Sequence, residues 1–263
     1  MAYVENGALQ AAIDNAVVGE TVVLTGDITL TNRVTVSNVV TIDLNGYSIK
    51  GDINDSYGAI YIGTKGALII EDNSLKKTGS VINTAGNAIG NYGVVNIYEG
   101  TFIGNYALYN FYYSDTIYGN STIYGGIFKS VDKNSPSIAN CGDLTVNGGT
   151  IESIDTTNVL NVTGGTIESL YIGVEDYNPS IQSTSVSGGY IASLSVANDS
   201  ANDITVTGGT FGTEINSEYF ADGYKLTYDE GTGLYGVATD SSSSGGGFKV
   251  IATSSSKIRD LVI

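Results

Sequence analysis

The chain of 263 residues contains no histidine, no tryptophan, one cysteine and two prolines. Without histidine, a nucleophilic side chain has no histidine to act as its base. The lone cysteine, Cys141, excludes an intrachain disulfide. Because no histidine is present to act as its base, we interpret Cys141 as a small buried or turn residue.

Basic residues are also scarce, with 11 Lys and Arg against 27 Asp and Glu and a formal net charge of −16. An acidic surface repels phosphate groups, so neither nucleic acid nor an anionic membrane is an expected partner. No apolar run approaches the roughly 20 residues of a membrane-spanning helix, so no membrane insertion is expected. The first residues, Met1 to Gly7, lack the basic and apolar parts of a secretory signal.

Glycine and tyrosine are abundant, with 35 and 19 residues. Runs of valine, isoleucine, threonine and tyrosine are separated by glycine and asparagine, which is typical of short strands joined by turns. Six segments repeat one pattern of alternating apolar residues, a glycine-containing turn and a further apolar residue. They are VNIYEGTF (95–102), TIYGGIF (122–128), LTVNGGTI (144–151), LNVTGGTI (160–167), TSVSGGYI (184–191) and ITVTGGTF (204–211).

The repeat has a loose period, because its second glycines are 26, 23, 16, 24 and 20 residues apart. A fixed motif in a loose period indicates a solenoid whose loops vary while one strand–turn–strand corner stays constant. Leu144 and Val146 are expected to face inward, and Thr145 and Asn147 outward. The glycines permit a sharp corner that a Cβ atom would obstruct.

A second recurring element precedes the corners, in AIGNYG (88–93), ALYN (107–110) and SIANCG (137–142). It places Asn91, Asn110 and Asn140 at equivalent positions. We expect these side chains to form a ladder in which each is bonded to the next coil. The alternative is that each is an ordinary turn asparagine.

The two ends of the chain differ from the repeats. Residues 6–18 carry Leu9, Ile13, Ala16 and Val17 at helical spacing, and Asn6 is positioned to cap a helix that covers the open end of the solenoid. Strands are expected at 21–30, 33–36 and 39–49. The predicted organisation is an N-terminal cap (1–20), a β-helix (21–219), a closing β-hairpin (220–239) with its turn at 229–233, a Ser/Gly linker (240–247) and a docking segment (248–263).

Three stretches carry a family resemblance: LQAAIDNAVVGETVVLTGDITLTNRVTVSNVVTIDLNGYSI (9–49), the VTGGT corners and GYKLTYDEGTGLYGV (223–237). Over about residues 3–237 the chain resembles pectate-lyase-like right-handed β-helix proteins, of the kind found in phage structural proteins and bacterial surface proteins. The resemblance implies an all-β fold: a right-handed parallel β-helix (solenoid) with a short N-terminal capping α-helix and a C-terminal closing hairpin. Function does not follow, because the scaffold hosts lyases, hydrolases, adhesins and tailspikes.

The enzymes of this fold need residues that the chain lacks. Polygalacturonase-type hydrolases use a histidine in Gly-His-Gly and an Arg-x-Lys motif, and neither is present. Pectate lyases use calcium-binding carboxylates and a base, usually arginine. The only arginines are Arg33 and Arg259, and neither has carboxylates at matching coil positions. We therefore predict no catalytic residue, no metal and no cofactor.

A glycosidase needs only two carboxylates at a suitable separation. Glu152 and Glu168 both follow GGTI and should lie on one face of consecutive coils, as a carboxylate pair, a weak calcium site or two solvated surface acids. The remaining candidates are Asp43, Asp52, Asp55, Glu71, Asp72 and Asp155.

Eight tyrosines lie within residues 92–124. Flat amphipathic rings can stack on sugars or fill a subunit interface, although ordinary packing along the solenoid is an equal alternative. NFYYSD (110–115) interrupts the strand pattern and is expected to protrude. The candidate ligand-binding residues are Tyr106, Tyr109, Tyr112, Tyr113 and Tyr118.

These features favour a non-enzymatic structural or attachment protein of a phage virion, a decoration, fibre or spike component at the virion surface. It would be a homotrimer, could display a surface for polysaccharide, and would dock to other virion proteins through its last segment. The docking candidates are Phe248, Val250, Ile258, Arg259, Leu261 and Ile263. A bacterial cell-surface adhesin or glycan-binding module is the alternative, followed by a polysaccharide-degrading enzyme.

Overall fold

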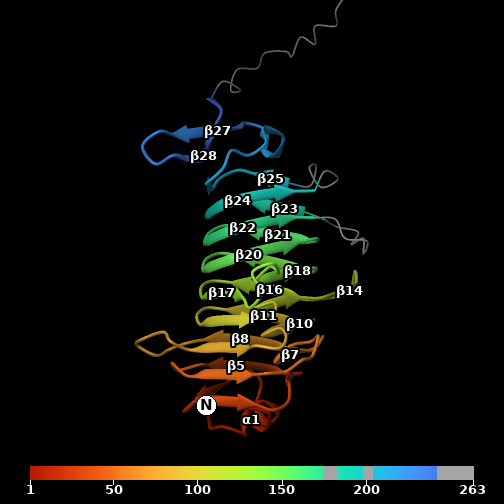
Figure 1. Cartoon of the computed structure of the whole chain (residues 1–263). Coiled ribbons are helices and arrows are strands. Elements are labelled where there is room, and N and C mark those ends of the chain that lie inside the picture. The colour runs from red at the N-terminus through yellow and green to blue at the C-terminus, as the bar shows by residue number, and fades with distance from the viewer. Residues whose placement is uncertain (174–182, 198–203, 242–263) are drawn as a thin grey trace, which may run out of the picture.

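The computed structural model describes residues 1–173, 183–197 and 204–241. Short strands stack as successive coils along one axis (Figure 1). Helix α1 (Leu9–Asn15) lies at one end, and the hairpin of β27 (Tyr224–Asp229) and β28 (Leu234–Thr239) lies at the other. The chain is an all-β parallel β-helix with a short N-terminal helix, as the sequence predicts.

The strands form rows along the axis, and neighbours within each row of coils are parallel and in register. The first row is β1 (Ala2–Val4), β2 (Glu20–Leu24), β5 (Val39–Asp43), β8 (Ala67–Glu71), β11 (Val94–Ile97), β16 (Asn120–Ile123), β19 (Asp143–Val146), β21 (Val159–Val162), β23 (Ser183–Val186) and β25 (Ile204–Val206). The second row is β3 (Ile28–Leu30), β6 (Ser48–Gly51), β9 (Ser80–Asn83), β12 (Thr101–Gly104), β17 (Ile127–Ser130), β20 (Thr150–Thr156), β22 (Thr166–Ile172), β24 (Tyr190–Val196) and β26 (Thr210–Phe211).

A third row exists only in the first half of the solenoid. It consists of β4 (Val34–Val36), β7 (Ile60–Ile62), β10 (Ile89–Asn91), β13 (Leu108–Asn110) and β18 (Ile138–Asn140). At β20 it merges with the second row, because the start of β20 pairs with β17 while its end pairs with β18. The coils therefore change from three short strands to one short and one long strand.

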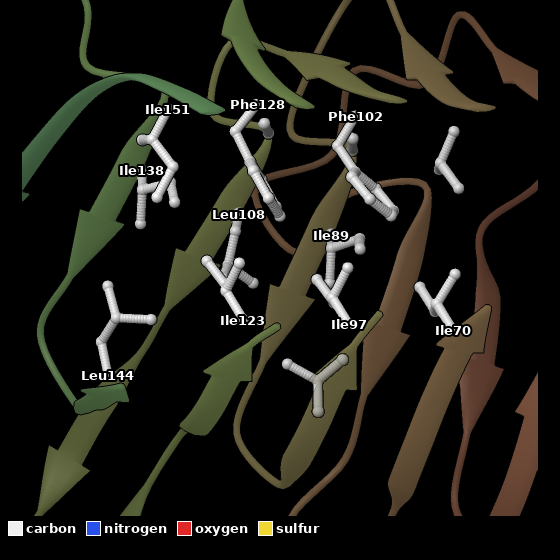
Figure 2. Close-up of a cluster of buried hydrophobic side chains, with 14 of the residues drawn as sticks. Ile70, Ile89, Ile97, Phe102, Leu108, Ile123, Phe128, Ile138, Leu144 and Ile151 are labelled. Atoms are coloured by element: carbon white, nitrogen blue, oxygen red, sulfur yellow. The ribbon is translucent and has the colours of Figure 1, made fainter. Parts of the chain in front are cut away.

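The interior is a continuous column of apolar side chains. In β19 alternate residues are buried, so Leu144 and Val146 face inward while Thr145 faces outward, as predicted. Figure 2 shows such side chains from the different rows converging on one interior. The rings of Phe102 and Phe128 stack there with centroids 5.0 Å apart. Because each coil covers the apolar face of the next, the column stabilises the stack as a whole.

The glycine pairs of the corners are needed for two different reasons. At the first glycine of each pair, a Cβ atom would lie 2.2–2.4 Å from a carbonyl oxygen of the preceding coil, as for Gly148 against Tyr124. The second glycine, such as Gly149, has a φ between +82° and +101° in these five corners. Close stacking therefore requires the first glycine, and the backbone turn requires the second.

The predicted asparagine ladder is present and fully buried. Asn91 Nδ2 donates to Asn110 Oδ1 at 2.9 Å, and Asn110 Nδ2 donates to Asn140 Oδ1 at 3.1 Å. Asn140 Nδ2 continues the ladder to Thr156 Oγ1 at 2.9 Å. The same amides also donate to backbone carbonyls of the first row, including that of Asp143. The ladder thus satisfies polar groups inside the turn between the third and first rows.

Two expectations about the N-terminal end are wrong. The helix spans Leu9–Asn15 rather than 6–18, and Val17 is 70% exposed. Asn6 does not cap the helix, because its Oδ1 accepts the backbone N–H of Thr29 on β3 at 2.9 Å. Gln10 Oε1 likewise accepts the N–H of Thr35 on β4, at 2.7 Å. Both side chains satisfy edge groups of the first coil, and for Asn6 that role replaces capping.

The C-terminal hairpin closes the other end with antiparallel pairing. β28 pairs with β26 at Phe211↔Tyr235 and with β27 along its whole length. The turn runs from Asp229 to Gly233, as expected, and the Gly233 N–H donates to the Asp229 carbonyl at 2.8 Å. Leu226, Tyr235 and Val237 pack against the core.

Candidate functional site

The outward side of the third strand row carries aromatic side chains. Tyr61 on β7, Gly90 on β10 and Tyr109 on β13 occupy one register position in successive coils. The neighbours of Tyr61 in the strand, Ile60 and Ile62, are buried, so the tyrosine faces outward. Strand periodicity therefore sets the two rings on one face, two coils apart.

Gly90 makes room for rings from other segments. A Cβ atom at this position would lie 2.0 Å from the Tyr57 carbonyl oxygen and 2.8 Å from Cε2 of Phe111. Tyr57 belongs to the loop before β7, and Phe111 directly follows β13. Without a side chain at Gly90, both residues can lie against the strand.

The rings form a continuous surface, which we call the aromatic strip: Tyr57, Tyr61, Tyr92, Tyr106, Tyr109 and Phe111. Phe111 is its centre, stacked on Tyr109 with centroids 4.2 Å apart and on Tyr92 with centroids 4.7 Å apart. Tyr57 lies 5.7 Å from Phe111 and 5.1 Å from Tyr61, measured between ring centroids. Contacts between neighbouring rings thus restrict the orientation of each ring.

A charged pair ends the strip near the N-terminal coils. The Arg33 guanidinium carbon lies 5.2 Å from the ring centroid of Tyr57 and 5.1 Å from that of Tyr61. Arg33 also forms an ion pair with Asp55, at 2.5 Å between Nη1 and Oδ2. Its Nε is buried and has no hydrogen-bond acceptor among the described residues. The pair offers donors and acceptors beside two aromatic rings.

Two phenols of the strip, those of Tyr61 and Tyr92, resist ionisation because their pKa values are raised. Burial raises the pKa of Tyr61, and the neighbouring Tyr57 adds to this effect while Arg33 opposes it. Burial likewise raises the pKa of Tyr92, with smaller effects from Tyr57 and Tyr61. At neutral pH these side chains are therefore hydroxyl donors on uncharged rings.

At its other end the strip borders a small hollow of about 70 Å³, lined by Tyr106, Tyr109, Pro136, Ala139, Cys141, Asp155 and Thr157. Cys141 is half-buried there, with its Sγ 3.9 Å from the Tyr109 hydroxyl oxygen. It directly follows the ladder residue Asn140, in agreement with a turn position.

The structure separates the five predicted tyrosines into two groups. Tyr106 and Tyr109 belong to the strip. Tyr112, Tyr113 and Tyr118 lie on a small antiparallel hairpin of β14 (Tyr112–Ser114) and β15 (Ile117–Tyr118), which projects sideways as expected (Figure 1). Tyr113 is 74% exposed. A hydrogen bond from the Tyr112 hydroxyl to Asp115, at 2.6 Å, raises the pKa of Tyr112.

Sequence reasoning missed Arg33, Tyr57, Tyr61 and Phe111 as members of one surface. A signal for Tyr61 existed, because AIYI (59–62) has the same form as ALYN (107–110) and occupies the same strand row. Tyr57 and Arg33 reach the strip from irregular segments of other coils. The sequence spacing of Tyr57 and Arg33 does not indicate that they lie together.

Two of the carboxylates considered for a glycosidase pair, Asp72 and Asp43, hold backbone groups. Asp72 is completely buried, and its two oxygens accept the N–H groups of Gly46, Ser74 and Gly79 at 2.7–3.0 Å. Burial alone would raise the pKa of Asp72, but its hydrogen bonds outweigh burial and lower it. Asp43 accepts the N–H groups of Asn45 and Asn73, both at 2.9 Å.

Glu152 and Glu168 lie at equivalent positions of adjacent strands, as predicted, between the pairs Ile151↔Ile167 and Ser153↔Ser169. Glu152 Oε2 accepts the backbone N–H of Ser130 at 3.0 Å. In the described ranges, no three His, Cys, Asp or Glu residues gather closely enough to hold a metal ion. No described helix is long and apolar enough to cross a membrane.

Comparisons of the chain with protein families, curated proteins and solved structures return no match. The predicted docking residues Phe248, Val250, Ile258, Arg259, Leu261 and Ile263 lie outside the described residues. The aromatic strip and its Arg33–Asp55 pair therefore form the candidate site on geometry alone.

Proposed function

We propose that this chain is a non-enzymatic attachment protein that binds a surface polysaccharide along the aromatic strip. The observation that carries the proposal is the contiguity of six rings with the Arg33–Asp55 ion pair. Aromatic rings combine apolar area with low conformational entropy, and an adjacent charged pair can bond to hydroxyl groups. From β7 to β13 the rings cross two coil spacings, and Arg33 directly before β4 extends the surface by one more, to about 14 Å, which suits a short stretch of an extended chain of sugars.

The exposed rings are the ones available for stacking. Within the strip, Tyr57 is 41% exposed and the other five rings are half-buried, and outside it Tyr113 on the β14–β15 hairpin is 74% exposed. Tyr113 lies near enough to contribute to the raised pKa of Tyr92. We infer that Tyr57 and Tyr113 contact the ligand, while Phe111 and Tyr92 support them.

A printed array of bacterial surface polysaccharides tests this function. The unmodified chain is expected to bind at least one polysaccharide, and Tyr57→Ala is expected to weaken that binding at least tenfold. Tyr3→Ala is the matched control, because Tyr3 is 71% exposed on the first strand row. Absence of binding across the array, or equal loss in both variants, would refute the proposal. Turnover of a bound polysaccharide would instead support the enzyme alternative.

The proposed setting is a phage virion, where the chain would be a decoration, fibre or spike component and a homotrimer. The parallel β-helix supports this setting, because phage spikes use scaffolds of this kind, but bacterial surface adhesins use them as well. Mass photometry of the full chain is expected to show a trimer, and a stable monomer would contradict that part. Neighbouring capsid and tail genes would favour the virion, and wall-anchoring signals in a longer gene would favour the adhesin.

A further inference from the structure

The edge strands at the two ends of the solenoid differ in what their backbone groups bond to. At the N-terminal end, Asn6 and Gln10 occupy backbone groups of the edge strands β3 and β4. The Gln10 amide even makes a pair of bonds, since its Nε2 also donates to the Thr35 carbonyl at 2.9 Å. At the C-terminal end, β27 is the last strand of its sheet and pairs with β28 alone among the described strands. Such an open edge invites pairing with another strand.

The register identifies which groups of β27 are open. The Asp240 N–H donates to the Gly223 carbonyl at 2.7 Å, in register with the β27–β28 pairs. Hydrogen-bonded pairs alternate along antiparallel strands, so Lys225 and Thr227 direct their backbone groups toward β28. Leu226 and Tyr228 therefore direct theirs away from β28, to the open edge.

Charge and shape at this end specify what could cover the edge. Residues 213–241 contain six acids and one base, Lys225, whereas residues 248–263 contain three bases and one acid. The six acids are Glu214, Glu218, Asp222, Asp229, Glu230 and Asp240. A hollow of about 350 Å³, lined in part by Tyr228, Leu234 and Tyr235, adjoins the hairpin and can receive an apolar side chain.

We infer that residues 248–263 bind the open edge of β27 in their own chain. β28 ends beside Tyr224, where β27 begins, so the segment can run along β27 from that end. The edge lies about two strand spacings, roughly 10 Å, from β28. Six linker residues, 242–247, have a root-mean-square span of about 13 Å. This match gives the tethered segment an effective concentration near the millimolar range, far above that of a second copy in dilute solution.

Backbone amide exchange, measured by NMR on the full chain and on residues 1–241, tests the inference. In the full chain, the amides of Leu226 and Tyr228 are expected to exchange at least tenfold more slowly than in the truncated chain. The amides of Lys225 and Thr227 serve as internal controls, because β28 protects them in both. Equal exchange at Leu226 and Tyr228 in the two proteins would overturn the inference.

Concentration and charge variants identify the occupant. The protection is expected to stay constant over a 100-fold dilution, whereas loss on dilution would assign the edge to a second copy and overturn the same-chain assignment. The triple variant Lys249→Glu, Lys257→Glu, Arg259→Glu is expected to lose most of the protection. The control variant Lys65→Glu, Lys76→Glu, Lys133→Glu changes the net charge equally at exposed positions elsewhere and should retain it. Equal protection of Leu226 and Tyr228 in the two charge variants would contradict the inference that the basic segment is held by the acidic hairpin.

Discussion

Asp72 shows how a single carboxylate holds a turn of this solenoid. Its pKa is lowered although burial opposes ionisation, because backbone N–H groups from three different residues converge on it. A group whose pKa is lower in the folded state stabilises that state above the unfolded pKa, and the contribution is lost as the pH falls through the folded pKa. Acid should therefore weaken the segments 44–46 and 72–79 together.

Replacing Asp72 with asparagine is expected to lower the free energy of unfolding by about 1–3 kcal/mol at pH 7, because one buried N–H group loses its acceptor. The difference from the unmodified protein should shrink once the pH falls below about 3.8. Urea unfolding at several pH values measures both quantities. Asp52→Asn, at an exposed carboxylate, is the control and should change stability by less than about 0.5 kcal/mol. A pH-independent difference would contradict the ionised role.

The glycine corners give a second prediction at the residue scale. In Gly148→Ala the new Cβ would lie 2.2 Å from the Tyr124 carbonyl oxygen, so the two coils must move apart. We expect the free energy of unfolding to fall by about 3 kcal/mol or more. Gly26→Ala meets no atom within 4 Å and should be neutral or slightly stabilising. Thermal unfolding of both variants checks this, and similar melting temperatures would refute the close-stacking role.

At the scale of elements, the asparagine ladder joins the third strand row to the first. Asn110→Ala removes the hydrogen bonds to Asn91 and Asn140 and the one accepted from Ser121. Because buried polar groups are then left unsatisfied, we expect the free energy of unfolding to fall by about 2–4 kcal/mol. Asn161→Ala, at an outward position of β21, is the control and should have little effect. Denaturant unfolding measures the stability of both variants, and equal losses of stability would contradict a special role for the ladder.

The elements divide into those that the sequence predicts and those that it does not. Corners and the ladder are predictable, because Gly148–Gly149 and Asn110 recur in repeats whose register follows from strand periodicity. The helix cap is not predictable from Asn6, because the same side chain can bond to an edge strand that is distant in sequence. The aromatic strip is only half predictable: Tyr109 lies in a repeat, whereas Tyr57 reaches the strip from a loop.

On the scale of the whole molecule, the repeats should be removable as units. Residues 147–162 span one turn of the solenoid, because Val146 and Val162 share a register position in β19 and β21. A chain without 147–162 would join Val146 to Thr163, remove the Gly148–Gly149 corner and preserve every other corner. We expect it to fold, to melt in one transition at a lower temperature, and to be shorter by about one strand spacing, roughly 5 Å.

Circular dichroism and small-angle scattering measure these outcomes. Deletion of 151–166 is equally long and also preserves the period, but it begins inside β20 and ends inside β22. It tests whether the point in the coil at which the deletion begins affects folding. Deletion of 147–154 removes half a turn and misaligns every later strand, so that variant should not fold. A folded half-turn deletion would contradict the register as described.

The uneven pairing between coils has a mechanical consequence for the attachment role proposed above. Because ladder hydrogen bonds run along the solenoid, a pull from end to end loads all bonds between two coils at once. β22 pairs with β20 at six positions, whereas β26 pairs with β24 at two. β28 also pairs with β26 at only two positions, whereas three β23–β25 pairs support the β24–β26 junction. Tension would therefore separate the C-terminal hairpin first, between Phe211 and Tyr235, before it separates the coils that bear the aromatic rings.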